Sequence, residues 1–275
     1  MSKLQGKVAL VTGSGRGVGQ AIALKLAKDG AKLVINDLDE APAMETTGLI
    51  KAAGSQAVAF VGDVTTKDFG ERFINAALDA FGRIDIIVNN AGYPWDTVIQ
   101  KVTDEQWYAM LDVHASAPFR ILRAAADYIR TATKSEMDKG EVIYRKVVNI
   151  SSIAGLYGNA GQIGYSAGKS AIIGMTKTLA KEWGRYNVNV NCVAFGLIST
   201  RITQPIGLGA ETANIAGREI RMGIQPEFID QMVKLIPLGR AGTPDDAAGA
   251  VYLFCLPESN YITGEVLLAS GGFVI

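Results

Sequence analysis

The sequence predicts an α/β fold, a doubly wound sheet of about seven parallel strands with helices on both faces. Apolar, strand-like runs recur along the 275 residues, and helical patterns lie between them. This alternation is typical of a parallel sheet that is covered on both sides. Internal repeats, low-complexity segments and linker-like stretches do not interrupt it. We therefore expect a single domain over residues 1–275.

The expected strands are spaced so that a helix fits between most successive pairs. The first run, Lys7–Thr12, is short and apolar, and a helical pattern extends from about Val18 to Lys28. Further along, Thr103 opens a capping-box pattern, and Thr243 stands before a proline and two carboxylates, as at a helix start. The strands are expected near residues 7–12, 31–36, 57–61, 84–89, 144–150, 188–193 and 265–269.

A glycine-rich turn, Gly13 to Gly19, joins the first strand to the first helix. Glycines permit positive φ and let a ligand approach the backbone. The start of the helix offers unpaired N–H groups and a partial positive charge, which suit a pyrophosphate. A glycine cluster alone is weak support, but in a strand–turn–helix context it predicts a dinucleotide site.

The second strand ends in an acidic residue, Asp37, about twenty residues further on, as a dinucleotide site requires. Its carboxylate can accept hydrogen bonds from the adenosine ribose and would repel a 2′-phosphate, which favours NAD(H) over NADP(H). Arg16 favours the opposite choice, because a guanidinium there could pair with that phosphate. We give Asp37 more weight. A plain turn residue at the strand end remains the alternative for this position.

Tyr165 and Lys169 are four residues apart, with Ser152 thirteen residues before the tyrosine. On a helix, residues i and i+4 share one face. An ammonium beside the phenol would lower its pKa from about 10. Ser152 could then hold a carbonyl oxygen while Tyr165 transfers a proton. An ordinary aromatic–cation pair is the alternative, which the serine and the glycine turn make less favourable.

These motifs resemble those of the short-chain dehydrogenase/reductase family, and the resemblance covers essentially the whole chain. It implies a Rossmann-type fold with NAD bound at the carboxyl ends of the strands. The matching segments are Thr12-Gly13-x-x-x-Gly17-x-Gly19, Asp63-Val64, Asn89-Asn90-Ala91-Gly92, Ser152 with Tyr165-x-x-x-Lys169, and Gly196-Leu197-Ile198-Ser199-Thr200.

The resemblance also implies roles for these residues. Tyr165 would act as general acid/base, Lys169 as the group that lowers its pKa and anchors the ribose, and Ser152 as the group that orients the carbonyl. Asp63 and Asn90 could instead be a helix cap and a structural amide. The residues expected to contact the cofactor are Gly13, Arg16, Gly17, Val18, Gly19, Asp37, Asp63, Val64, Asn90, Ala91, Gly92, Tyr165, Lys169, Ile198 and Thr200.

Two positions depart from the family pattern. His114 stands where the family usually has an asparagine, in Val113-His114-Ala115-Ser116-Ala117, and could join a proton relay. A hydrogen-bonded structural histidine is the alternative. Phe195 stands where the family usually has proline, so the loop after it is less constrained in φ. Trp95, Tyr157 and Phe195 could line the substrate pocket, although aromatic residues more often serve packing.

Two segments break the strand–helix rhythm. Residues 131–146 are polar and longer than the family usually needs, which we interpret as an extended helix end and a surface loop. Residues 201–236 occupy the place of the family's substrate lid. Apolar residues of this lid suit a hydrophobic or acyl substrate better than a phosphorylated one; they are Ile206, Leu208, Ile215, Ile220 and Ile224.

The predicted reaction is hydride transfer between NAD(H) and a secondary alcohol or ketone, with a hydrophobic or 3-oxoacyl-type substrate. The segments Asn149–Gly155 and Ile262–Glu265 resemble the branch that contains 3-oxoacyl thioester reductases, and many sugar, steroid and xenobiotic alcohol dehydrogenases share them. An NADP-dependent sugar or steroid alcohol dehydrogenase is therefore an alternative. A second is a non-catalytic NAD-binding scaffold of the same fold.

Composition limits the other classes. Lys plus Arg and Asp plus Glu are both 27, so the formal net charge is zero, and no basic stripe points to nucleic acid. Uninterrupted apolar stretches are too short to cross a membrane, and we expect no signal peptide, because Met1 to Gly6 is too short and polar for one. Cys192 and Cys255 lie in apolar runs, so buried free thiols and a cytoplasmic location are expected. We expect a small-molecule substrate, no metal site and, by family analogy, a homotetramer.

Overall fold

In the computed structural model, which describes residues 2–206 and 212–274, the chain forms the predicted α/β fold. Leu208, expected in the lid, lies outside the described residues. The main sheet has seven strands in the order β3-β2-β1-β4-β5-β6-β9, and every pairing in it is parallel. Its strands are β1 (Val8–Val11), β2 (Lys32–Asp37), β3 (Ala57–Val61), β4 (Ile86–Asn89), β5 (Arg145–Ser152), β6 (Val188–Phe195) and β9 (Val266–Ala269).

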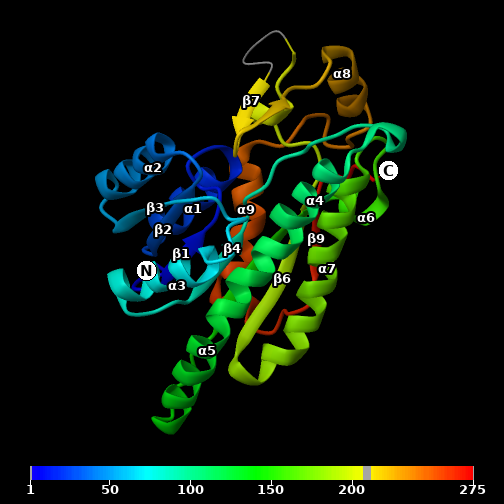
Figure 1. Ribbon diagram of the computed structural model, residues 1–275. Helices are drawn as coiled ribbons and strands as arrows, with labels where there is room; N and C mark the ends of the chain where they lie inside the picture. Colours follow the sequence, from blue (N-terminus) through cyan, green and yellow to red (C-terminus); the bar gives the residue numbers. More distant parts are fainter. Residues whose placement is uncertain (1, 207–211, 275) are drawn as a thin grey trace.

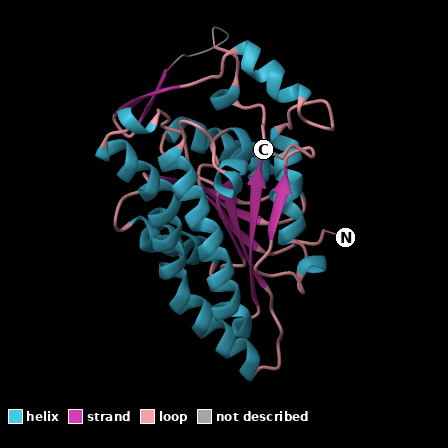
Figure 2. Cartoon of the chain, turned by 90° about the vertical axis from the view of Figure 1, so that its right-hand side faces the viewer, coloured by secondary structure: helices cyan, strands magenta, loops and turns pink. Residues whose placement is uncertain are grey.

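Two layers of helices enclose this sheet (Figures 1 and 2). The α-helices are α1 (Gly17–Lys28), α2 (Glu40–Ala52), α3 (Phe69–Phe81), α4 (Asp104–Leu111), α5 (Ala117–Asp138), α6 (Ile153–Tyr157), α7 (Ile163–Trp183), α8 (Pro226–Lys234) and α9 (Pro244–Cys255). The shorter turns are η1 (Ile99–Lys101), the π-helical η2 (Asp112–Ser116), η3 (Gly184–Tyr186), η4 (Arg201–Thr203) and η5 (Pro257–Ser259).

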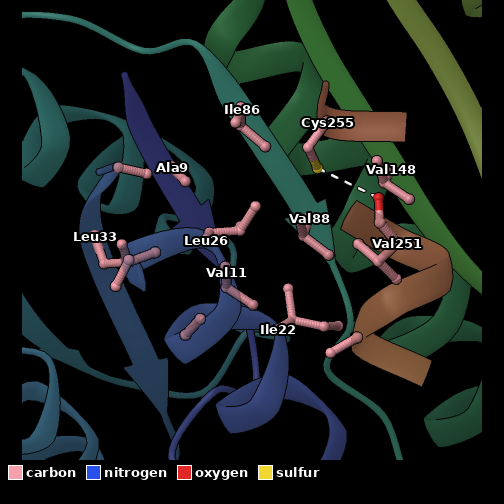
Figure 3. Close-up of a cluster of buried hydrophobic side chains, with 14 of the residues drawn as sticks. Ala9, Val11, Ile22, Leu26, Leu33, Ile86, Val88, Val148, Val251 and Cys255 are labelled. Carbon is pink, nitrogen blue, oxygen red and sulfur yellow. Dashed lines mark hydrogen bonds between the residues drawn. The ribbon is translucent and has the colours of Figure 1, made fainter. Parts of the chain in front are cut away.

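Alternation along β1 shows why both faces of the sheet are buried. Ala9 and Val11 point to the core shared with α1 and α9, part of which Figure 3 shows. Val8 and Leu10 point to the opposite core, shared with α3, α5 and α7. Successive side chains of a strand face opposite sides, so a strand that is apolar throughout needs a helix layer on each side. The sequence prediction of this architecture is confirmed.

Register brings the functional segments to one edge of the sheet. Val11 of β1 pairs with Ile35 of β2 and with Val88 of β4. The chain therefore leaves these three strands at the same level, and strand order reverses between β1 and β4. Ligands of doubly wound sheets bind in the crevice at such a reversal, outside the carboxyl ends of the strands.

Of the two segments that break the strand–helix rhythm, one has the predicted structure and the other contains an element that was not predicted. As expected, the segment 131–146 holds the end of α5 and a loop, with residues 145 and 146 beginning β5, and α5 extends past the far end of the sheet (Figure 1). Arg145 ties this extension down through a buried ion pair with Glu136 and a hydrogen bond to Thr133. Residues 201–236 hold a hairpin of β7 (Thr212–Ile215) and β8 (Arg218–Arg221), followed by α8. The sequence analysis did not predict that hairpin.

Local predictions of capping and cysteine state are confirmed. Thr103 and Thr243 each form a capping box at the start of α4 and α9. Cys192 and Cys255 are buried free thiols. Within the described ranges, no helix is long and apolar enough to cross a membrane, and no set of three or more His, Cys, Asp or Glu side chains is arranged to hold a metal ion.

Candidate active site

A cavity of about 1460 Å³ lies at the carboxyl ends of the strands. Every residue that the sequence analysis predicted for cofactor contact or catalysis lines this cavity, including His114 and Ser152. These residues lie at or after the carboxyl ends of six strands, β1 to β6, and in α1, η2 and α7. The fold therefore brings together side chains that are up to about 190 positions apart in the chain, as expected at the strand-order reversal.

Buried polar side chains fix the glycine turn at one end of the cavity. Asn36, a polar residue inside an apolar strand, accepts from the Gly13 N–H and donates to the carbonyls of Phe60 and Gly62. Asn90 donates through Nδ2 to the carbonyls of Thr12 and Gly13, at 2.9 and 3.0 Å. The Asn90 amide thus has the structural role that the sequence left open. The sequence analysis did not identify Asn36 as a residue that fixes the turn, although a polar side chain inside an apolar strand indicates such a role.

Two glycines of the turn are required by close packing, and a third faces the cavity. A Cβ at Gly13 would lie 2.9 Å from the Ala91 Cα, and one at Gly19 would overlap the Gly13 carbonyl. Gly17, with φ of +55°, would bring a Cβ no closer than 4.0 Å to Thr200. The turn is therefore packed tightly against its own protein and open toward the cavity, which leaves room for a ligand's phosphates against the start of α1.

Asp37 and Arg16 take different positions around the turn. Asp37 is half-buried, and its Oδ2 accepts from the Gly15 N–H at 3.0 Å. Its Oδ1 accepts from the Asp39 N–H at 3.2 Å. Arg16 is exposed and pairs with the Asp39 carboxylate at 3.0 Å. The carboxylate at the end of β2 is thus held in place by the backbone, while the guanidinium is neutralised by a different acid.

The remaining nominated cofactor residues form the walls of the cavity. Asp63 Oδ1 accepts from the Thr65 N–H and hydroxyl, at 2.8 and 2.7 Å, so its side chain orders the loop after β3. Val64 is buried beside it. On the opposite side, Ile198 is buried and Thr200 caps η4, which places the loop after β6 at the cavity.

Tyr165, Ser152 and Lys169 meet at the other end of the cavity. Ser152 ends β5 and caps α6, and its side chain lies near enough to Tyr165 to lower the pKa of that phenol. Lys169 is buried one turn along α7, with Nζ 5.7 Å from the centre of the Tyr165 ring. Gly155 allows this arrangement, because a Cβ there would lie 2.7 Å from the Lys169 carbonyl carbon. The helical i, i+4 geometry predicted from the sequence is confirmed.

The predicted lowering of the Tyr165 pKa is wrong for the protein without ligands. Burial raises the pKa of Tyr165 to about 12, and the Asp96 carboxylate adds to this, while the nearby Ser152 side chain acts in the opposite direction. Lys169 does not reverse the shift, and its ammonium donates to the Ile150 carbonyl at 2.9 Å. Burial also lowers the pKa of Lys169 to about 8. Spacing along a helix predicts proximity but not burial.

The two departures from the family pattern are both buried. His114 lies in η2, and its Nε2 is 3.0 Å from the Tyr93 carbonyl oxygen. Burial, and then the Lys169 charge, hold the pKa of His114 well below its usual range. Phe195 packs inward, in the core shared with α1 and α9, while part of it reaches the cavity wall.

Sequence reasoning missed two contacts at the rim of the cavity. Gln162, just before α7, donates to the carboxylate of Asp96, which follows β4. Arg218 on the hairpin pairs with Glu105 of α4 at 3.1 Å, and its guanidinium lies 5.7 Å from the ring centre of Trp95. Both contacts join segments that are 66 or more residues apart, so local patterns carried no signal for them.

Comparison with known proteins decides the family. A model of the short chain dehydrogenase family matches residues 7–210. The chain belongs to the short-chain dehydrogenase family. As a short-chain dehydrogenase it is an oxidoreductase that acts on CH–OH groups with a nicotinamide cofactor, and its relatives place it in the branch that contains 3-oxoacyl reductases.

Several curated relatives of this short-chain dehydrogenase align over nearly their full length. It is 35% identical to the 3-oxoacyl-[acyl-carrier-protein] reductase of Synechocystis sp., with 100% of both chains covered. It is 33% identical to the (3R)-3-hydroxyacyl-CoA dehydrogenase of Canis lupus familiaris, with 98% of this chain and 97% of that one covered.

A solved structure has the same fold. It comes from Sinorhizobium meliloti 1021 and carries the description short-chain alcohol dehydrogenase. It superimposes with a TM-score of 0.85 at 29% identity, over 98% of this chain and 97% of that one.

Proposed function

We propose that this short-chain dehydrogenase transfers a hydride between NAD(H) and a secondary alcohol or ketone of hydrophobic or 3-oxoacyl type. The observation that carries the proposal is a single cavity with Tyr165, Ser152 and Lys169 at one end and the Asp37 carboxylate at the other. The cofactor carries the hydride, and the protein supplies binding, orientation and proton transfer.

Each side chain has a distinct role in this proposal. Ser152 holds the substrate carbonyl oxygen, and Tyr165 donates a proton to that oxygen in reduction and removes it in oxidation. Lys169 exchanges its bond to the Ile150 carbonyl for the ribose and, beside the phenol, favours the phenolate. The turn at Gly17 and the start of α1 hold the pyrophosphate. Asp63, Val64, Ile198 and Thr200 enclose the adenine and carboxamide ends.

NAD(H) is proposed over NADP(H) because of charge at the end of β2. Asp37 is fixed at the ribose end of the cavity and would repel a 2′-phosphate, whereas Arg16 is already paired with Asp39. Among the relatives, the names of the reductase and the acyl-CoA dehydrogenase refer to acyl thioesters. They support a 3-oxoacyl-type substrate here.

Lys169 provides a test through pH. Because its pKa is lowered to about 8, the ammonium loses its proton as pH rises through that value. We expect the affinity for NADH to be constant at neutral pH and to weaken above about pH 8. NADH fluorescence titrations should show this break in the wild-type protein and in Lys177→Met, an exposed lysine of the same helix. Lys169→Met should remove it. A break that persists in Lys169→Met would contradict the assignment.

We propose that the hairpin and α8 form the lid over the substrate end of the cavity. Ile220 and Met222 of this region are buried in the same apolar cluster as Tyr93 and Met110, and both contribute to the surface of the cavity. That surface suits an acyl chain. Ile206, Ile215 and Ile224 are partly buried there, as the sequence suggested.

Arg218 is expected to hold that lid. Replacing it by alanine removes the ion pair with Glu105 and the contact with Trp95, together worth about 1 kcal/mol. We expect KM for the ketone to rise roughly fivefold, while the Kd for NADH stays within about twofold. Arg130→Ala, which breaks an exposed pair on α5, is the matched control. Steady-state kinetics that show an unchanged KM in Arg218→Ala would refute the role.

The direct test of the proposal is a turnover screen over ketones and 3-oxoacyl thioesters, with NADH oxidation as the signal. NADH binding with no turnover of any of them would favour a scaffold role instead.

We further propose a homotetramer in the cytoplasm that binds neither nucleic acid nor membrane. A mass of about 29.2 kDa in light scattering, which is the mass of one chain, would contradict this assembly.

A further inference from the structure

His114 occupies a site built to hold an imidazole in one orientation. It lies within the π-helical turn η2 and is 2% exposed. A Cβ at Gly92 would lie 2.8 Å from its Nδ1, and a Cβ at Gly168 would lie 2.7 Å from its own Cβ. The two glycines therefore make room for this side chain and prevent it from swinging away. Such π-turns often occur at functional sites.

Hydrogen bonding fixes the tautomer of this ring. The Tyr93 carbonyl oxygen can only accept a hydrogen bond, so Nε2, at 3.0 Å, carries the proton and donates it. Nδ1 is then an unprotonated acceptor, and the described part of the chain offers it no donor. Nδ1 is itself buried and faces Gly92.

The same ring contacts the proposed acid/base. The imidazole and the Tyr165 phenol have centroids 4.9 Å apart and planes at 85°, an edge-to-face arrangement. This geometry is a favoured one for aromatic pairs. His114 belongs to the turn between α4 and α5, whereas Tyr165 belongs to α7, so the contact fixes the phenol against an independent element.

We propose that His114 is a positioning residue for Tyr165, a neutral imidazole that is locked by Gly92, Gly168 and the Tyr93 carbonyl and that holds the phenol ring by its edge. This inference rests on the proposed function of Tyr165. This positioning role replaces the proton relay that the sequence analysis allowed, because the hydrogen bonding of the ring does not suit a relay. A relay must take a proton on one nitrogen and release one from the other, and Nε2 donates to a main-chain carbonyl that can pass no proton on. A proton added at Nδ1 would also create a second buried cation beside Lys169.

Few ionisable groups face these two rings. Lys169 faces both of them from α7. Asp96, from the loop after β4, acts on the pKa of Tyr165, and so does the Ser152 side chain of β5. His114 itself faces the Tyr93 main chain. Burial also raises the pKa of Asp96, so an ionisation near about pH 6.5 in the rate profile is assigned to His114 only if it disappears in the His114 variants.

Two substitutions separate the ring from the hydrogen bond. His114→Phe keeps an aromatic edge against Tyr165 and loses the donor to Tyr93. His114→Gln keeps an amide donor and loses the ring. If the edge contact positions Tyr165, His114→Phe should have a kcat within about threefold of the wild type, and His114→Gln should have a kcat about tenfold below it. The KM for NADH should be unchanged in both variants. The wild-type profile of kcat/KM should show no ionisation near about pH 6.5.

A second measurement needs no substrate. Phenolate absorbance at alkaline pH, taken as the difference from Tyr165→Phe, reports the ionisation of Tyr165 alone. Below about pH 11, it should be silent in the wild-type protein and in His114→Phe, and should appear in His114→Gln, because water reaches the phenol once the ring is gone. Thermal melting confirms that each variant is folded.

The outcomes are decisive and separate this inference from the proposed function. The positioning role is overturned if His114→Phe loses as much kcat as His114→Gln, or if His114→Gln matches the wild type in both measurements. An ionisation near about pH 6.5 that disappears in both variants would establish the relay instead. Normal turnover by Tyr165→Phe would refute the proposed function itself, whatever the His114 variants do.

Discussion

Replacing Tyr165 by phenylalanine is expected to lower kcat by roughly a thousandfold, the range of a positioned general acid/base. The substitution removes one oxygen and leaves the ring against His114 and the helix geometry unchanged. The Kd for NADH should therefore stay within about twofold, because the glycine turn and Asp37 are proposed to bind the other end of the cofactor. Stopped-flow or steady-state reduction of a ketone, together with NADH fluorescence, measures both quantities.

Tyr157 provides the matched control for this variant. It is half exposed on α6, a short distance along the chain, and lies outside the cavity wall. Tyr157→Phe should therefore have a kcat within about twofold of the wild type, as surface changes usually do. Near-normal turnover by Tyr165→Phe would show that proton transfer uses another group, and the enzymatic assignment of this site would fail.

Replacing Asp37 by asparagine is expected to change cofactor preference. In kcat/KM the wild-type protein should favour NADH over NADPH, and the variant should lose roughly 10- to 100-fold of that preference. The loss follows because a hydrogen bond to a charged group contributes about 1.5–3 kcal/mol, and because the repulsion of a phosphate disappears with the charge. Arg16 stays near the site and can pair with the phosphate once Asp37 is neutral.

Asp68→Asn is the control for Asp37→Asn, because it neutralises an exposed carboxylate, paired with Arg72, away from the cavity. Its cofactor preference should equal that of the wild type. Both variants need melting curves, since Asp37 also accepts the Gly15 and Asp39 N–H groups. A wild-type preference for NADPH would show that Arg16 outweighs Asp37 and would assign the protein to the NADP(H)-dependent enzymes.

The architecture could be predicted because its signals are local. Strand runs near 7–12 and 31–36 correspond to β1 and β2, and the run after Gly164 lies in α7, where Tyr165 and Lys169 are one turn apart as expected. Apolar periodicity, turn glycines and capping residues depend on neighbours within a few positions, so they can be read without a structure. The same locality explains why the nominated residues all reach one cavity, since parallel strands end at one edge.

Contacts between distant parts of the chain could not be predicted from local sequence patterns. The hairpin is held by Arg218 on Glu105, 113 residues away, and Gln162 reaches Asp96 across 66 residues. Neither contact leaves a periodic pattern. The hairpin strands are four residues each and partly exposed, so they lack the apolar runs that identified the main sheet.

The sequence by itself determined the fold, the family resemblance and the identity of the residues that could do chemistry, because those depend on residue type and spacing. Only the tertiary structure decided their protonation. Tyr165 has a raised pKa and Lys169 a lowered one because both are desolvated. Burial, and then the Lys169 charge, hold the pKa of His114 well below its usual range. Desolvation is the sum over every atom that excludes water from a group, and that sum exists only once the distant segments have packed together.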